Sequence, residues 1–202
     1  MKLKVNRFYK FGFWFLVSIV LILFNIFRIT KIGYKKNFDL YKSNATKRLL
    51  SLYTSNTILN RKVDSINGNE IITGKKKENL FKGKVLAILL SDFKCDRCQL
   101  NELKRLLRIE KELKTKGIKI IGITTKNKID LLIPQRKIIH IDFPLYYVSD
   151  EKFYNELSFS KDFPQIIFIA NNIILSAFKS VANDDEFSEK YYSHLVSILA
   201  KN

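Results

Sequence analysis

The chain has 202 residues, of which 47% are hydrophobic, and it carries a formal net charge of +17 at pH 7. This length and apolar content suit one globular domain with an appendage, and they exclude a disordered polymer. With only two cysteines, the chain has no disulfide framework and too few thiols for a zinc site made of cysteines alone.

The basic residues are concentrated at the start of the chain. Residues 1–36 hold eight lysines and arginines and no acid, which leaves a net charge of +9 for residues 37–202. A basic surplus suits nucleic acid or anionic lipid as a partner. No basic stretch is interleaved with a nucleic-acid-binding module, so we expect a solvated basic surface and no nucleic-acid partner.

An uncharged apolar run of seventeen residues, Phe11 to Phe27, follows the basic N-terminus. As a helix it spans about 26 Å, close to the lower limit for crossing a bilayer, and the flanking Lys10 and Arg28 can extend it by snorkelling. A secretory signal peptide begins in the same way, but no cleavage pattern of small residues follows this run. We therefore predict an uncleaved transmembrane anchor rather than a removed signal or a buried soluble helix.

The orientation of this anchor is inferred from the short segment that precedes the apolar run. Four basic residues precede the span and four follow it closely, so the positive-inside bias is nearly balanced. Because only ten residues lie before the span, we place the N-terminus in the cytoplasm. The globular part is then expected outside the cytoplasm, on the periplasmic or cell-surface side.

Beyond the span, apolar residues from 37 to about 60 allow a helix that leads away from the membrane. A polar stretch with Asn67-Gly68 as a turn signal comes next and predicts a linker or a hairpin. The chain is thus divided into a basic flank and anchor (1–36), a helical stalk or linker (37–68) and a globular domain (69–202).

The globular part begins with a strand over 85–90, a helix over 98–116 and a strand over 118–124. Gly117 fits the helix end, where glycine accepts a positive φ. A strand, a helix and a strand within about forty residues predict a right-handed parallel βαβ unit, and so an α/β fold. Ligand chemistry belongs at the carboxyl end of the first strand, where Cys95 lies.

The second half of the domain has weaker signals followed by stronger ones. A weak helix is expected near 129–133, an apolar stretch covers 138–143, and a short helix is expected around 151–157. Two β-rich runs, 165–170 and 173–178, are joined by Asn171-Asn172, residues that tolerate the positive φ of a two-residue hairpin. A closing helix is expected over 184–200.

Cys95 and Cys98 lie three residues apart at the start of the helix over 98–116. Inside a helix, Cβ atoms at this spacing are about 5 to 6 Å apart, whereas a disulfide needs roughly 3.5 to 4.5 Å. The pair therefore suits a helix edge, where unpaired N–H groups and the helix dipole favour a thiolate on Cys95. A thiolate is the species that attacks disulfides, so the pair is predicted to be redox-active.

Three stretches together resemble the thioredoxin superfamily over residues 69–202: Lys82 to Val85 before the first strand, SDFKCDRCQ around the cysteines, and Phe163-Pro164 before the hairpin. The likeness is to the membrane-tethered branch related to thiol-specific antioxidant and cytochrome-maturation proteins. It implies a three-layer fold with a central mixed sheet, here preceded by one transmembrane helix. It also implies a thiol-disulfide oxidoreductase without a cofactor, acting on protein thiols or disulfides together with a redox partner.

The resemblance also assigns roles to single residues. It makes Cys95 the attacking thiol and Cys98 the resolving thiol. It makes the peptide bond before Pro164 cis, and it places Phe163 and Pro164 opposite the cysteines, where they help to hold an extended substrate chain.

The chain departs from the family pattern around the cysteines. Asp96-Arg97 stands where thioredoxin has Gly-Pro, and Lys94 stands where it has Trp. Arg97 and Lys94 favour the thiolate and Asp96 opposes it, so Asp92, Asp96 and Arg97 are the residues expected to tune the site.

The buried acid of thioredoxin is also missing, since Leu89 occupies its position. Asp92 or Glu102 is the candidate substitute, with a plain surface acid as the alternative at both positions. The peroxiredoxin pattern is absent as well, because it requires proline and threonine where this chain has Ile88 and Asp92.

Several alternatives to redox chemistry stay open. The cysteines can form an inert clip, although so short a loop removes little entropy from the unfolded chain. The domain can be a redox-silent module that binds extended polypeptide, which the missing acid favours. A copper carrier would need His140 or His194 beside the thiolates; neither has the spacing of copper-delivering relatives, so we expect structural histidines and no metal.

Overall fold

The computed structural model describes residues 2–91 and 96–199, and the chain divides into two units, residues 1–46 and residues 47–202. All described residues of the first unit belong to helix α1 (Lys2–Asn56). Its residues from Lys47 onward belong to the second unit.

The first unit contains the apolar run. The helix there is long and apolar enough to cross a membrane, a property that signal sequences near an N-terminus share. Its large apolar side chains, among them Trp14, Leu21 and Phe27, are not covered by other parts of the protein and are exposed. The chain therefore has a candidate membrane span where the sequence predicts one.

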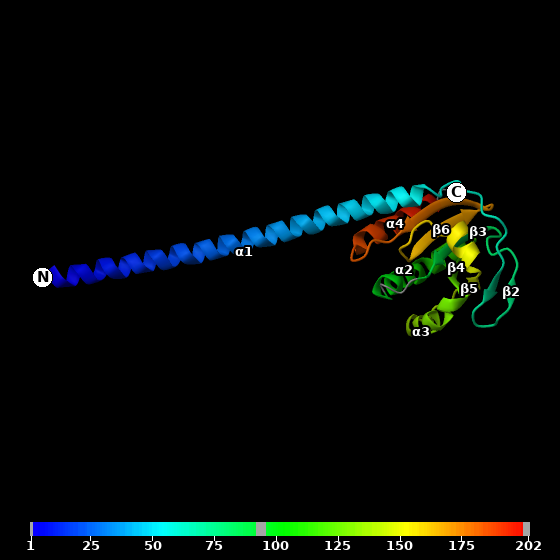
Figure 1. The fold of residues 1–202 in the computed structure, drawn as a ribbon, viewed down its shortest axis with the longest axis horizontal. Helices are drawn as coiled ribbons and strands as arrows, with labels where there is room; N and C mark the ends of the chain where they lie inside the picture. Colours follow the sequence, from blue (N-terminus) through cyan, green and yellow to red (C-terminus); the bar gives the residue numbers. More distant parts are fainter. Residues whose placement is uncertain (1, 92–95, 200–202) are drawn as a thin grey trace. The chain divides into compact units, whose positions relative to one another are not determined.

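A seven-stranded mixed sheet formed by the described residues is the centre of the second unit (Figure 1). Its order is β2-β1-β5-β4-β3-β6-β7. The strands are β1 (Gly68–Glu70), β2 (Lys76–Lys77), β3 (Lys84–Leu89), β4 (Ile118–Thr125), β5 (Leu145–Val148), β6 (Gln165–Ala170) and β7 (Ile173–Lys179).

Strand β3 lies at the middle of this sheet. It pairs in parallel with β4 and antiparallel with β6, so Leu86 faces Ile120 on one side and Phe168 on the other. Strand β5 continues the parallel part beside β4, whereas β7 and β1 add antiparallel neighbours. Strands that are covered on both faces read as continuous apolar runs, and from Val85 to Leu89 every residue of β3 is buried.

Helices cover one face of the sheet. Leu86 and Ile88 of β3 pack there in a core with residues from α2 (Asp96–Thr115), α3 (Ile129–Ile139) and α4 (Asp185–Leu199). Helices α2 and α3 share this face because their parallel crossovers, β3 to β4 and β4 to β5, run in the same direction along the sheet and such crossovers are right-handed. Helix α4 follows β7 and packs in the same core through Tyr192 and Leu195.

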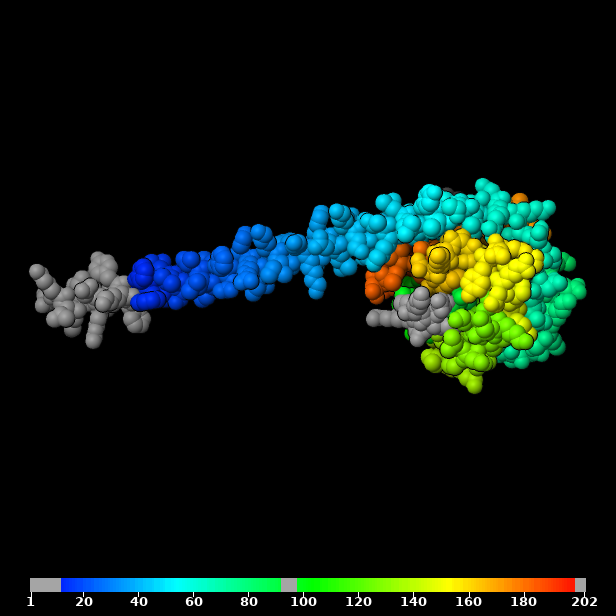
Figure 2. All heavy atoms as spheres, viewed as in Figure 1, coloured from blue at the N-terminus to red at the C-terminus, as the bar shows by residue number. Residues whose placement is uncertain are grey.

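The opposite face is covered by less regular structure. Val85, Ala87 and Leu89 pack there against the segment 58–66 that follows α1 and against η3 (Lys152–Leu157), a short π-helical segment. In the space-filling view, these two segments lie next to each other at the surface, in cyan and yellow (Figure 2). The sheet thus has a covering layer on each side, and the predicted three-layer α/β fold is confirmed.

Most of the predicted elements are present. The strand, helix and strand around the cysteines are found as β3, α2 and β4, and Gly117 ends α2 with φ of +69°. The hairpin of β6 and β7 turns at Asn171 and Asn172, whose φ angles are +53° and +60°. The polar stretch before the domain forms the short β1–β2 hairpin.

The region between β4 and η3 differs from the expectation. The helix predicted over 129–133 continues as α3 through Pro134 to Ile139, and it ends with His140 at φ of +52°. The sequence analysis also missed strand β5, which has only four residues and directly follows Pro144. In both places tertiary packing overrides the local signal: buried Leu132 fixes α3 to the core, and β5 pairs with β4.

Candidate functional site

The predicted redox motif begins where strand β3 ends. Leu90 and Ser91 are buried beyond the strand, and helix α2 begins at Asp96. Cys98 is partly buried in the first turn of α2, the helix edge that the spacing of the cysteines predicts. Cys95 and Asp92 lie outside the described residues, as do the side chains of Asp96 and Arg97, so the geometry of the cysteine pair stays a prediction.

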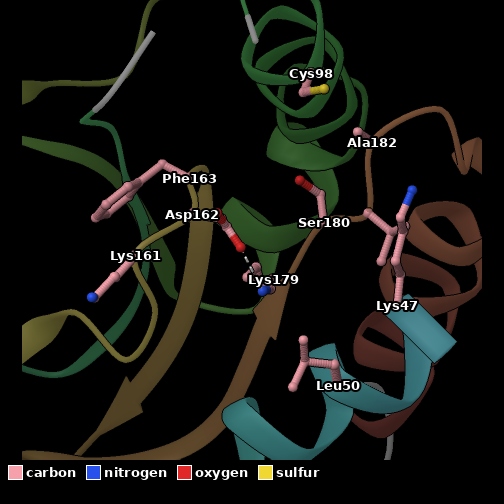
Figure 3. Close-up of a pocket in the computed structure, with 10 residues that line it drawn as sticks. Lys47, Leu50, Cys98, Lys161, Asp162, Phe163, Lys179, Ser180 and Ala182 are labelled. Atoms are coloured by element: carbon pink, nitrogen blue, oxygen red, sulfur yellow. Dashed lines mark hydrogen bonds and ion pairs between the residues drawn. The ribbon is translucent and has the colours of Figure 1, made fainter. Parts of the chain in front are cut away.

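A pocket of about 290 Å³ adjoins Cys98 (Figure 3). Its walls come from the end of α1, the loop before β6, and the segment that joins β7 to α4. They consist of Lys47, Leu50, Cys98, Lys161, Asp162, Phe163, Lys179, Ser180, Val181 and Ala182. The structure therefore brings Cys98 and Phe163, which are distant in the sequence, to one cavity.

The predicted substrate-binding residues end the loop that leads into β6. The Phe163-Pro164 peptide bond is cis, as the resemblance implies. Pro164 is buried and Phe163 is partly buried. Their contact with a substrate remains a prediction.

Aromatic packing holds Phe163 in place. Its ring stacks on Phe153 with 5.6 Å between centroids, and the ring of Tyr154 meets it edge-on at 6.4 Å. The hydroxyl of Tyr154 lies 2.8 Å from Oγ of Ser91, directly after the end of β3. Segment η3 thereby ties the loop before β6 to the strand that leads to the cysteines.

Gln165, the first residue of β6, fixes the same loop from inside. It is completely buried. Its Oε1 accepts a hydrogen bond from N–H of Phe159 at 2.9 Å, and its Nε2 donates to the carbonyl oxygens of Ser160 and Asp162 at 2.7 and 3.0 Å. The sequence analysis missed this residue, although a lone polar side chain at the start of the apolar run QIIFIA was a usable signal.

A buried lysine supports the loop from β7. The ammonium of Lys179 donates to the carboxylate of Asp162 at 3.0 Å. The side chain of Lys179 is 8% exposed, whereas that of Asp162 is 78% exposed. The main-chain carbonyl of Lys179 also accepts a hydrogen bond from Oγ of Ser51.

Glu102, one of the two candidate substitutes for the missing acid, is buried in α2 rather than placed on the surface. It accepts hydrogen bonds from Nη1 of Arg105 at 2.7 Å and from the hydroxyls of Ser188 and Tyr192 at 2.8 Å each. Burial raises its pKa, while these donors oppose the shift. A small cavity of about 30 Å³ borders both Glu102 and Cys98.

Leu89 is fully buried on the face of the sheet opposite α2, in the core that contains Val85 and Phe153. No carboxylate stands at this point of β3. The surrounding core is apolar, so an acid there would have no described partner and would be costly to ionise.

The two histidines of the copper alternative lie apart in the fold. His140 is an exposed residue at the end of α3, and His194 is exposed on α4. Within residues 2–91 and 96–199, no three side chains of histidine, cysteine, aspartate or glutamate are grouped as a metal site requires.

No protein-family model and no curated protein matches the sequence. Solved structures do resemble the fold, at low sequence identity. The thioredoxin domain of a thiol-disulfide oxidoreductase from Bacteroides vulgatus has a TM-score of 0.51 at 19% identity, over 66% of this chain and 96% of that one.

Two further structures give a similar result. A thiol:disulfide interchange protein from a Bacteroides species has a TM-score of 0.50 at 18% identity, over 65% of this chain and 87% of the other. Peroxidoxin BcpB from Mycobacterium tuberculosis has a TM-score of 0.52 at 15% identity, over 71% and 96% of the two chains. The protein therefore has a thioredoxin-like fold, with an N-terminal helix that is a candidate membrane span.

Proposed function

We propose that the protein is a membrane-anchored thiol-disulfide oxidoreductase that exchanges a Cys95-Cys98 dithiol or disulfide with protein substrates outside the cytoplasm. The thioredoxin-like fold supports this proposal, as do the similar structures named for thiol-disulfide oxidoreductases. The observation that carries it is the shared pocket of Cys98 and Phe163, because it brings a cysteine of the motif to the residue before Pro164.

In the reductive direction, the thiolate of Cys95 attacks one sulfur of a substrate disulfide. A mixed disulfide forms and the first substrate sulfur leaves as a thiolate. The thiolate of Cys98 then attacks the sulfur of Cys95, closes the Cys95-Cys98 bond and releases the second substrate sulfur. Two electrons pass to the substrate, and the two thiol protons end on its sulfurs. The reverse sequence donates a disulfide.

The position of Cys95 favours its role as the attacking thiol. It directly precedes Asp96, the first residue of α2, and the first N–H groups of a helix have no partner within the helix. These groups and the helix dipole stabilise a thiolate. Cys98 is one turn further along and is partly buried, which suits the resolving role.

Trapping of mixed disulfides tests these roles. Cys98→Ser should accumulate covalent complexes with partner proteins that a reducing agent releases, because the attack by Cys95 is not followed by resolution. Cys95→Ser should accumulate none. Equal trapping by both variants, or by neither, contradicts the assignment.

The redox-silent binding module is the second candidate, and the apolar environment of Leu89 favours it, since the customary proton acceptor is absent. Reduction of insulin in the presence of a dithiol source separates the two functions. An oxidoreductase speeds insulin reduction, whereas a redox-silent module leaves the rate at that of the dithiol alone.

We also propose that helix α1 anchors the protein with its globular unit outside the cytoplasm. Protease treatment of intact cells, combined with thiol alkylation of Cys95 and Cys98, tests location and redox state together. If the protease cleaves the domain only after the cytoplasmic membrane is disrupted, the domain lies in the cytoplasm and the proposed orientation is wrong.

A further inference from the structure

We propose that the pocket beside Cys98 is a binding subsite for an acidic segment of the polypeptide substrate. The inference rests on the proposed exchange function and adds a substrate class to it. It concerns the 290 Å³ cavity that the end of α1, the loop before β6 and the β7–α4 segment enclose.

Apolar and basic side chains line the pocket together. Leu50, Phe163 and Val181 supply apolar surface, and Lys47 and Lys161, here called the rim lysines, lie on opposite sides of the view (Figure 3). Both lysines are exposed. Such a mixture suits a polypeptide segment that brings apolar groups to the pocket and carboxylates to the rim lysines.

The two rim lysines are available to bind carboxylates. Among the described residues, neither Lys47 nor Lys161 takes part in an ion pair with an acid. Within the described part of the pocket lining the one acid is Asp162, whose carboxylate is held by the buried ammonium of Lys179 at 3.0 Å. The fixed charges that line the pocket therefore leave two positive charges for a substrate.

The acids on the other side of Cys98 do not cancel these charges. Glu102 and Asp185 border a separate small cavity, where both carboxylates accept hydrogen bonds from Arg105. Among the described residues, the excess of positive charge thus lies at the pocket that Lys47 and Lys161 line together with Cys98.

Charge complementarity of this kind acts mainly on the rate of association and on partner choice. Two exposed lysines beside a partly apolar cavity should raise the exchange rate with an acidic substrate by about tenfold over a basic one at low salt. The preference should fall as the ionic strength rises, because exposed charges are screened.

The test uses the full chain in neutral detergent micelles and three disulfide-linked peptides of equal length. The peptides carry aspartate and glutamate, alanine and serine, or lysine beside the disulfide, and a fluorophore reports exchange. The variant Lys47→Glu/Lys161→Glu reverses the charge of the two rim lysines. The control Lys75→Glu/Lys76→Glu changes the net charge equally at exposed lysines of the β1–β2 hairpin.

The native chain should exchange fastest with the acidic peptide, and the rim variant should prefer the lysine peptide. The control should exchange with the three peptides in the same order of rates as the native chain. Equal native rates for all three peptides, or loss of the preference in the control as well, would overturn the subsite. No exchange with any peptide would instead contradict the proposed function itself.

A second arm compares vesicles of phosphatidylcholine with vesicles that also contain phosphatidylglycerol. If the rim lysines bind peptide, the acidic preference persists in both preparations. If phosphatidylglycerol abolishes the acidic preference of both the native chain and the control, and leaves the preference of the rim variant unchanged, the lysines bind lipid headgroups and the proposal is wrong.

Discussion

Arg48 in the last turns of α1 and Asp184 directly before α4 form an ion pair with two hydrogen bonds. The contacts from Nε to Oδ2 and from Nη2 to Oδ1 are both 2.6 Å. Asp184 is nearly inaccessible to solvent and also accepts a bond from N–H of Phe187 at 3.3 Å, so it caps the helix. One carboxylate thus fixes the end of α1 to the start of α4 inside the globular unit.

Replacement of Asp184 by Asn should lower the free energy of unfolding by about 1 to 3 kcal/mol, because it leaves Arg48 with only the exposed Glu186 as a charged partner. Arg48 lowers the pKa of Asp184, so this contribution is complete above the unfolded-state pKa and is lost as the pH falls through the lower folded-state value. Chemical denaturation followed by near-ultraviolet circular dichroism should show the two proteins converging below about pH 4. Glu186→Gln, at the exposed second partner of Arg48, should have a smaller effect.

Glu102→Ala should destabilise the protein by about 1 to 3 kcal/mol, since it leaves the hydroxyls of Ser188 and Tyr192 without their common acceptor, while Arg105 keeps Asp185 and Glu189 as partners. Glu102→Gln keeps an acceptor oxygen and should cost less. Denaturant titration of the two variants measures the difference. Equal stability of Glu102→Ala and the native chain would contradict the network.

The pH dependence of Glu102 has the opposite sign to that of Asp184. Burial raises the pKa of Glu102 in the folded state, so folding binds a proton and this contribution decreases as the pH rises from the unfolded-state pKa through the folded-state one. Glu102→Gln should remove this slope between about pH 4 and the higher folded value. An unchanged slope in the variant would mean that Glu102 is not its source.

Gln165→Leu should weaken the loop before β6 more than the rest of the fold. The substitution preserves volume but removes the bonds to Phe159, Ser160 and Asp162. We expect a loss of about 2 kcal/mol in stability and a slower exchange with peptide disulfides. Ser176→Ala, which removes the hydroxyl contact with Tyr191, is the matched control and should lower stability without slowing exchange.

The β6–β7 turn can be tested at Asn172, where φ is +60°. Valine cannot adopt this conformation easily, so Asn172→Val should cost about 1 to 2 kcal/mol. Glycine adopts it freely, and Asn172→Gly should stay within about 0.5 kcal/mol of the native chain. Thermal unfolding of both variants provides the comparison, and similar losses would contradict the turn geometry.

If α1 is the proposed membrane anchor, charges placed within its apolar run should have a large effect on membrane insertion. Leu21→Arg together with Leu23→Arg should cost about 5 to 7 kcal/mol of membrane insertion, since each arginine at a helix centre costs about 2.5 to 3.5 kcal/mol. The variant should be released from membranes by alkaline carbonate, whereas the native chain should remain. Tyr34→Arg with Tyr41→Arg, outside the run, should stay bound.

The strongest sequence signals predicted the structure well. The βαβ unit of β3, α2 and β4, the hairpin at Asn171-Asn172 and the closing helix are all present, because hydrophobic periodicity and turn chemistry are local properties. The helix edge at Cys98 is found for the same reason. The cavity walls were not predictable in this way, since Lys47 and Lys179 line one pocket only because α1 packs against the end of β7, where Ser51 donates to the carbonyl of Lys179.

The features that the sequence analysis missed or left open depend on contacts across the fold. The length of α3 beyond Pro134 follows from burial of Leu132. The role of Gln165 depends on the loop before β6, which brings N–H of Phe159, six residues upstream, to its side chain. Glu102 has charged and polar neighbours on both α2 and α4, and no local pattern distinguishes it from a surface acid.

The two edges of the sheet have a consequence for solubility. Segment 60–63 pairs with the edge strand β7 through bonds from N–H of Asn60 and Val63 to the carbonyls of Ile174 and Asn172. The opposite edge is a strand of only two exposed lysines, Lys76 and Lys77. Unprotected edges invite strand-to-strand aggregation between molecules. Both edges are thereby protected against pairing with the sheet of a second molecule.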